Sequence, residues 1–309
     1  MGDKEKISKR DILPVVLMGG LFVLIHLLAL GITGTFQEAG MEAFEDPDDP
    51  MNIAFIIVIM LVFTLVILLI AKFWKKQLIQ AIILGAIGYT SAYVFYPLFE
   101  IIFLPLVSVI LSALLAILLV IVLYKYPEWY VIDLCGIIVG TGAIAIFGIS
   151  LGILLVIILL IGLAIYDAIS VYKTKHMIDL ADTVMDLKLP VLLVIPKIKK
   201  YSLIKETRRL KEQIEQDEER DAFFMGLGDI VMPGILVAAI YKNIPQPEGL
   251  TMALSVIIGT LIGFSILMIF VMRGKPQAGL PLLCGGAIIG YLISSFLLFG
   301  TLTGLNLSF

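Results

Sequence analysis

Long apolar segments alternate with short polar ones along almost the whole chain. The hydrocarbon core of a bilayer is about 30 Å thick, and a helix of roughly 20 apolar residues crosses it. The pattern therefore predicts an all-α membrane protein. We expect nine transmembrane helices, at 12–34, 51–71, 78–98, 101–124, 131–148, 150–172, 221–241, 249–271 and 279–300.

Two neighbouring pairs of these segments are joined by almost no linker. The third and fourth helices meet near Pro97, and the fifth and sixth meet near Gly148. Proline and glycine both weaken helices, so we expect tight reversals at these two residues. A single long bent helix in either place is the alternative.

One long polar insert, residues 173–220, divides the chain into three parts. Residues 1–172 carry the first six helices, and residues 221–309 carry the last three. Inside the insert, the run VLLVIP at 191–196 is too short to cross a bilayer. We expect this run to lie at the membrane interface or to form a β-strand.

The Lys and Arg residues fall almost entirely on one side of this topology. Cytoplasmic loops of membrane proteins carry an excess of Lys and Arg. With a cytoplasmic N-terminus, all of the 22 basic residues except Lys242 lie on the cytoplasmic side. The opposite loop, 35–50, holds six acidic residues and no basic one. We therefore expect the N-terminus and the 173–220 loop in the cytoplasm and the C-terminus outside.

Composition agrees with a membrane protein. Charged residues make up 15% of the chain and hydrophobic ones 60%, whereas a soluble domain carries about 25% charged residues. An ordinary soluble enzyme is therefore excluded. The net charge of −3 lacks the basic footprint of a nucleic-acid-binding protein. Cys135 and Cys284 both lie in apolar segments, which does not support a disulfide framework.

The first apolar run reaches Gly34, which is too long for a cleavable signal peptide. We expect a retained first helix in a multi-pass integral membrane protein. Its membrane would be the cell membrane in a prokaryote or an endomembrane in a eukaryote.

Two aspartates lie inside predicted transmembrane helices, where an ionisable side chain costs about 2.5–3.5 kcal/mol to insert. Asp167 precedes Lys173 by six residues, so it lies about 9 Å inside the cytoplasmic face. Asp229 follows Arg220 by nine residues, about 13 Å inside the same face. Two carboxyl groups at similar depth in consecutive antiparallel helices can share a proton. They are the candidate catalytic residues.

Small residues and prolines occur in the sequence near Asp229 and at a similar depth in the ninth helix. Asp229 ends the run Gly226-Leu227-Gly228-Asp229 and is followed by Pro233, so the backbone there can approach a neighbour closely. Pro281, six residues past Lys275, opens the ninth helix at a matching depth. The pairs Gly136/Gly140 and Gly259/Gly263 have the G-x-x-x-G spacing of close helix packing.

Other polar residues receive ordinary roles. Glu128 and Asp133 sit at the inner edge of the fifth helix, where we expect them to reach water. His26 lies deep in the first helix and is expected to be packed and hydrogen-bonded. Ser150 fits the G-x-S-x-G nucleophile pattern, but a serine nucleophile needs a base within reach, and His176 is expected on the opposite side of the membrane. No metal-binding or cofactor-binding motif occurs, so we expect neither a metal nor a cofactor.

The two aspartate motifs together resemble the presenilin and signal peptide peptidase family of intramembrane aspartyl proteases. The residues that carry the resemblance are Tyr166-Asp167, Gly226-Leu227-Gly228-Asp229 and Pro281. The likeness extends to the nine helices and the long insert, and it points to a presenilin-like fold. Where the family reads Pro-Ala-Leu, this chain has Pro281-Leu282-Leu283. The expected orientation is that of presenilins, and the chain most resembles compact microbial, archaeal-type members.

The resemblance implies a hydrolase that cuts peptide bonds in transmembrane helices with two aspartates that activate a water. Asp167 and Asp229 would be catalytic, and the supporting residues would be Tyr166, Gly226, Leu227, Gly228, Pro281, Leu282 and Leu283. The larger Leu282 would crowd the site or mark altered activity. An extended substrate segment would pair with an exposed strand edge, offered by VLLVIP or by the backbone near Pro281. The implied partners are transmembrane-helix substrates and the lipid bilayer; a homo-oligomer and accessory subunits stay open.

Three alternatives remain at this point. A proton-coupled transporter or ion channel can use a buried aspartate pair as a relay, although the chain has no clear inverted repeats. A prepilin-peptidase-like enzyme shares the G-x-G-D pattern but cuts at the membrane surface. A non-catalytic scaffold would follow if Leu282 marks lost activity.

Overall fold

The computed structural model describes residues 9–73, 76–174, 192–198, 201–203, 222–272 and 277–305. These residues form nine α-helices, one π-helical turn and two β-strands. The α-helices are α1 (Lys9–Glu38), α2 (Met51–Phe73), α3 (Lys76–Glu100), α4 (Pro105–Lys125), α5 (Trp129–Ser150), α6 (Ile153–Ile169), α9 (Leu227–Asn243), α10 (Glu248–Val271) and α11 (Gly279–Phe299). The π-helical turn η1 covers Ser170–Thr174, and the strands are β1 (Leu192–Pro196) and β2 (Ala222–Gly226).

Each predicted transmembrane segment overlaps one of these helices. Seven helices in the described ranges are long and apolar enough to cross a membrane: α1, α3, α4, α5, α6 with η1, α10 and α11. The other two are α2 and α9, which has 17 residues. The all-helical membrane architecture is thus confirmed, and the crossing of the bilayer by all nine helices stays a prediction.

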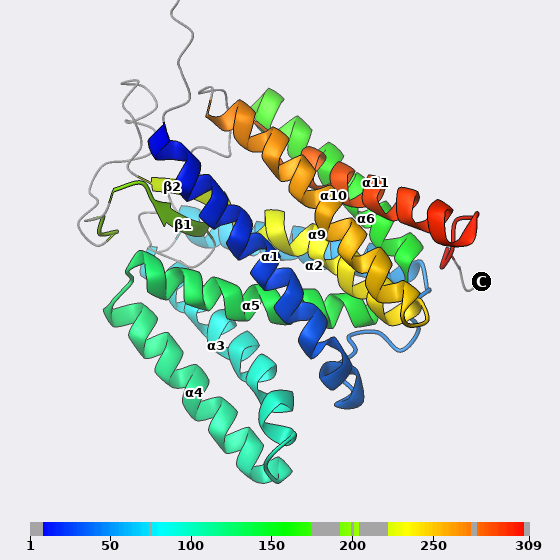
Figure 1. Cartoon of the computed structure of the whole chain (residues 1–309). Helices are drawn as coiled ribbons and strands as arrows, with labels where there is room; N and C mark the ends of the chain where they lie inside the picture. The colour runs from blue at the N-terminus through cyan, green and yellow to red at the C-terminus, as the bar shows by residue number, and fades with distance from the viewer. Residues whose placement is uncertain are drawn as a thin grey trace, which may run out of the picture.

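The helices form three groups in space. α3 and α4 pack together at one side of the molecule, and α6, α10 and α11 lie at the other side (Figure 1). Between them, α5 packs against both α1 and α9. The two-stranded sheet lies on α5, near the end of the molecule where α1 begins (Figure 1). The main hydrophobic core therefore gathers where α1, α9 and α10 meet, around fully buried residues such as Phe22, Ile235 and Met252.

Both predicted helix pairs are separate helices, so the bent-helix alternative is wrong. The reversals lie further along the chain than we expected, because α3 continues past Pro97 and α5 continues past Gly148. Inside a bilayer a backbone that leaves a helix early has unpaired N–H and C=O groups, which favours continuing to the membrane surface. α4 begins at Pro105, where the missing N–H is not needed. Gly152 is the N-cap residue of α6, directly before its first residue.

The start of the seventh predicted helix, 221–241, is wrong. Residues 222–226 form β2, which pairs antiparallel with β1. Phe223 and Phe224 are aromatic residues, which favour strands, and β1 confirms the strand alternative for the VLLVIP run. The depth of Asp229, counted along a helix from Arg220, therefore does not apply. Most of the predicted 173–220 loop lies outside the described residues.

Glycines hold α10 and α11 together. A Cβ added at Gly259 would collide with the carbonyl oxygen of Gly286, and one at Gly263 would collide with that of Leu282. The two helices therefore touch backbone to backbone, as small residues permit in membranes. This contact includes the first turn of α11 and so fixes the height of that turn beside α10.

Candidate active site

Asp167 lies in the last turn of α6, just before the helix changes into η1. Its side chain is only 6% exposed. Its Oδ2 accepts a hydrogen bond of 3.1 Å from the backbone N–H of Leu280. The first turn of α11 thus holds a buried carboxyl group of α6.

Asp229 lies in the first turn of α9, directly after β2. Two glycines allow the backbone to approach its carboxyl group. A Cβ added at Gly226 would lie 3.4 Å from Oδ2, and one added at Gly279 would lie 2.9 Å from the same atom. The second distance is shorter than real side chains tolerate, so Asp229 rests on a position that only glycine fills without displacing it.

One short segment at the start of α11 therefore contacts both aspartates. Gly279 lies against Asp229, and the next residue, Leu280, binds Asp167. Because Gly279 and Leu280 are consecutive residues, the two carboxyl groups lie close to each other. Sequence reasoning selects Pro281 and misses the two residues before it, although a glycine between a basic loop and a proline signals a close backbone approach.

The helix ends around the pair favour negative charge. The first turns of α9 and α11 both lie at the site, and the N-terminal turn of a helix carries unpaired N–H groups and the positive end of the dipole. Burial of Asp167 and partial burial of its neighbour Asp229 oppose two full charges. The arrangement therefore favours a single negative charge shared by Asp167 and Asp229. Within the described ranges, no group of three or more His, Cys, Asp or Glu side chains could hold a metal ion.

The residues before Asp229 have different surroundings. Gly226 lies beside the carboxyl group of Asp229, so that an added Cβ would reach it. Leu227 packs on α5, where a Cβ added at Gly140 would lie 3.1 Å from its Cδ1. Gly228 is exposed and has open space where a Cβ would lie. The supporting roles of these residues stay predictions, and Gly226 is the one of the three beside the carboxyl group.

The remaining expected residues lie around the pair with no described contact to a carboxyl group. Tyr166 is 68% exposed. Leu283 is fully buried, whereas Pro281 and Leu282 are half-buried. The carbonyl of Leu282 faces Gly263 of α10. Their roles at the site stay predictions.

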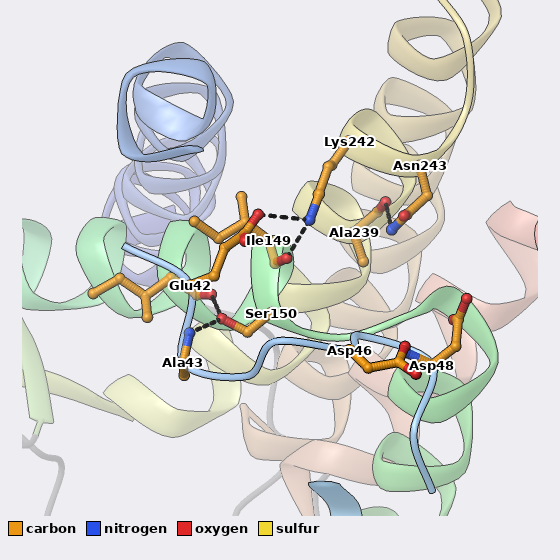
Figure 2. Close-up of polar contacts among 10 residues, drawn as sticks. Glu42, Ala43, Asp46, Asp48, Ile149, Ser150, Ala239, Lys242 and Asn243 are labelled. Atoms are coloured by element: carbon orange, nitrogen blue, oxygen red, sulfur yellow. Dashed lines mark hydrogen bonds and ion pairs between the residues drawn. The ribbon is translucent and has the colours of Figure 1, made fainter. Parts of the chain in front are cut away.

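Ser150 has a structural role. Its hydroxyl donates a hydrogen bond to the carbonyl of Ile146 and accepts one of 2.7 Å from the N–H of Ala43 (Figure 2). These bonds tie the loop before α2 to the end of α5. His26 is fully buried, and its Nδ1 lies 2.7 Å from the carbonyl of Phe22. His26 is therefore packed and hydrogen-bonded, as expected.

A second polar cluster lies at the opposite ends of α6 and α9 from the aspartates. Lys242, near the end of α9, pairs with Glu42 at 3.0 Å and donates to the carbonyl of Ile149 at 2.6 Å (Figure 2). The one basic residue predicted outside thus meets an acid of the loop predicted outside.

Asp133 does not reach water, contrary to the sequence-based expectation. It is 5% exposed, and its Oδ1 accepts a hydrogen bond of 2.8 Å from the N–H of Val194 in β1. Glu128 is half-buried and accepts hydrogen bonds from the Ser202 hydroxyl at 2.6 Å and the Leu203 N–H at 3.1 Å. No local pattern signals these contacts, because the partners are backbone and side-chain groups some 60 to 75 positions further on.

Comparison with known proteins agrees with this geometry. The family model described as signal-peptide peptidase, presenilin aspartyl protease matches residues 19–301. A search among curated proteins finds no match.

Two solved structures, each described as a presenilin family intramembrane aspartate protease, resemble the chain along most of its length. They come from two crystal forms and are 31% and 34% identical, with TM-scores of 0.66 and 0.69. Each match covers 93% of this chain and 99% of the other. The chain is therefore a multi-pass integral membrane protein that belongs to the signal-peptide peptidase and presenilin family of aspartyl proteases.

Proposed function

We propose that Asp167 and Asp229 are the catalytic pair of this protease. The observation that carries the proposal is that consecutive residues of α11 lie at the two carboxyl groups, Gly279 beside Asp229 and Leu280 bonded to Asp167. One ionised aspartate takes a proton from water, while the other, protonated, donates a hydrogen bond to the scissile carbonyl. The water attacks, a tetrahedral diol forms, and no covalent enzyme intermediate arises. Because the pair titrates as one unit, either carboxyl group can take either role.

We propose transmembrane helices of membrane proteins as the substrates. A helix shields its peptide carbonyls in hydrogen bonds, so the segment to be cut must unwind. An extended segment would recover backbone hydrogen bonds by adding to a strand edge. Such a segment would remain in the bilayer up to the depth at which the aspartates lie.

The sheet favours β2, rather than the VLLVIP strand, for this pairing. The N–H of Val194 in β1 goes to Asp133, on the edge away from β2. Val194 and its partner Phe224 then form a pair whose N–H groups point away from the other strand. Phe224 presents its backbone at the other edge, and β2 ends at Gly226, three residues before Asp229. A strand added there would lead directly to the catalytic pair.

We also propose nine crossings, with the N-terminus and the 173–220 loop cytoplasmic and with 1–172 and 221–309 as the two helical parts. The contact of Lys242 with Glu42 supports this topology, because it puts two of the predicted outside segments at one end of the molecule. A Glu45→Cys variant of the protein, expressed in intact cells, tests this orientation. An impermeant thiol reagent should label this variant from outside, and labelling only after lysis would contradict the orientation.

The function is tested in sealed liposomes that contain the purified protein and a tagged single-span substrate. The proposal predicts a cut inside the apolar segment and no pH change in the lumen. The transporter alternative predicts proton flux and an intact substrate.

A further inference from the structure

The sheet and the start of α9 both pack against one face of α5. Asp133, Gly136 and Gly140 are three and four residues apart and therefore share this face. A Cβ added at Gly136 would lie 2.7 Å from Leu193 of β1, and one at Gly140 would lie 3.1 Å from Leu227 of α9. α5 thus touches the strand and the residue that opens the helix of Asp229.

Asp133 supplies the polar contact on this face. Its carboxyl group is almost completely buried and binds the N–H of Val194, the central residue of β1, at 2.8 Å. The strand pairing uses the opposite edge of β1, so this bond is independent of β2. Burying a carboxyl group is costly unless it is hydrogen-bonded. The bond from Val194 satisfies Asp133 and fixes the position of β1 along α5.

Glu128 makes a second attachment one turn earlier. It binds Ser202 and Leu203, which follow β1 in the chain. Two carboxyl groups, one at the N-cap of α5 and one within it, therefore hold the strand and the segment that follows it. Leu203 is also buried, in a hydrophobic cluster that includes Val131 and Ile132 of α5. The strand and the segment after it are therefore held at two separated points.

The position of β1 is linked to the proposed catalytic pair through its partner strand, β2. Leu192 of β1 pairs with Gly226, the last residue of β2. Gly226 lies beside the carboxyl group of Asp229, because a Cβ added there would be 3.4 Å from Oδ2. A shift of β1 along α5 would therefore move Gly226 and, with it, the approach to Asp229. A misplacement of about 1 Å can cost roughly 10²-fold in rate.

We infer that Asp133 is a positioning residue of this protease, which sets the register of the β1–β2 sheet relative to Asp229. The inference rests on the proposed catalytic role of Asp229. Asp133 acts through Val194 and Gly226 and does not touch the reacting atoms.

Three variants of the full-length protein test the inference. Asp133→Ala removes the acceptor, and Asp133→Asn keeps an oxygen that can accept from Val194. Thr141→Val is the matched control, since Thr141 is a buried polar residue of α5 whose hydroxyl has no hydrogen-bond partner among the described residues.

Hydrogen exchange of the backbone amides of 192–195 in detergent is the first measurement and needs no activity, since Pro196 has no N–H. In the Asp133→Ala variant these amides should exchange at least about tenfold faster, because the strand loses its hydrogen bond to α5 and opens more often. Asp133→Asn and Thr141→Val should exchange them at the wild-type rate. Unchanged exchange in Asp133→Ala would overturn the inference.

Cleavage of a single-span substrate is the second measurement, scaled to the amount of folded enzyme. Asp133→Ala should lower kcat about tenfold or more and cut at neighbouring bonds as well, while Asp133→Asn restores the wild-type cut. A merely structural role would leave KM, kcat and the cut position unchanged for the folded fraction, and that result would also overturn the inference. A wild-type protein that cuts nothing would instead reject the proposed function and leave the exchange result standing.

Discussion

Leu280 donates its backbone N–H to Asp167 at 3.1 Å and thereby joins the end of α6 to the start of α11. The preceding residue, Gly279, lies against the carboxyl group of Asp229. Both aspartates are thus held by the backbone of one helical turn.

Gly279→Ala should therefore damage the site while leaving the fold intact. The added methyl would meet Oδ2 of Asp229 at 2.9 Å and force the carboxyl group to move. We expect kcat/KM for a single-span substrate to fall about 10²-fold. Gly285→Ala in the same helix is the control, because open space surrounds that position. Equal activity of the two variants would show that Asp229 does not need this contact.

Gly259→Ala should destabilise the contact between α10 and α11. Its methyl would collide with the backbone carbonyl of Gly286, which cannot move aside as a flexible side chain can. Overpacking of this kind costs about 1–3 kcal/mol. Reversible unfolding in mixed detergent measures the loss. Gly162→Ala in α6, where nothing lies within 4 Å of the added atom, should leave the unfolding free energy near the wild-type value.

Lys242→Gln should lower the free energy of unfolding by about 1–2 kcal/mol, because the substitution removes the charged group that donates hydrogen bonds to Glu42 and to the Ile149 carbonyl. Glu42→Gln should cost less, about 0–1 kcal/mol, because Lys242 keeps its bond to the carbonyl of Ile149. Unfolding of the two single variants and the double variant gives the coupling between the side chains. Strict additivity of the two effects would contradict the ion pair seen in Figure 2.

Asp48 should make stability depend on pH. Burial raises the pKa of Asp48 above its ordinary value, Asp46 raises it further, and Lys242 partly lowers it. Between the ordinary and the raised pKa, the folded protein holds more protons than the unfolded chain, so stability falls as pH rises through this window. Asp48→Asn should flatten that fall in a series of melting temperatures against pH. A melting profile of Asp48→Asn with the wild-type slope would assign the dependence to other groups.

Much of the helical frame follows from the sequence, because apolar runs of bilayer length have few other stable structures. The two reversals are displaced for the same reason, since the backbone stays helical past Pro97 and Gly148 while it lacks water. β2 is missed because an apolar run of five residues reads equally well as the start of a helix. Its strand form depends on pairing with β1, which lies far away in the sequence.

In the candidate site, too, features set by the local sequence are predicted, and contacts with distant segments are missed. Asp167 and Asp229 stand out because each is an ionisable residue in an apolar segment. Gly279 and Leu280 contribute through backbone atoms, which no side-chain pattern reveals. Asp133 is misjudged because its depth suggests contact with water, whereas a distant strand covers it.

The most direct test is the cut made by the wild-type protein beside Asp167→Asn and Asp229→Asn. The three proteins are reconstituted with one tagged single-span substrate, and mass spectrometry locates the new termini. The aspartate pair predicts a cut within the apolar segment by the wild type and at least about 10³-fold less product from each variant, with each variant as thermally stable as the wild type or more so. Full activity in either variant would contradict a mechanism that needs both carboxyl groups.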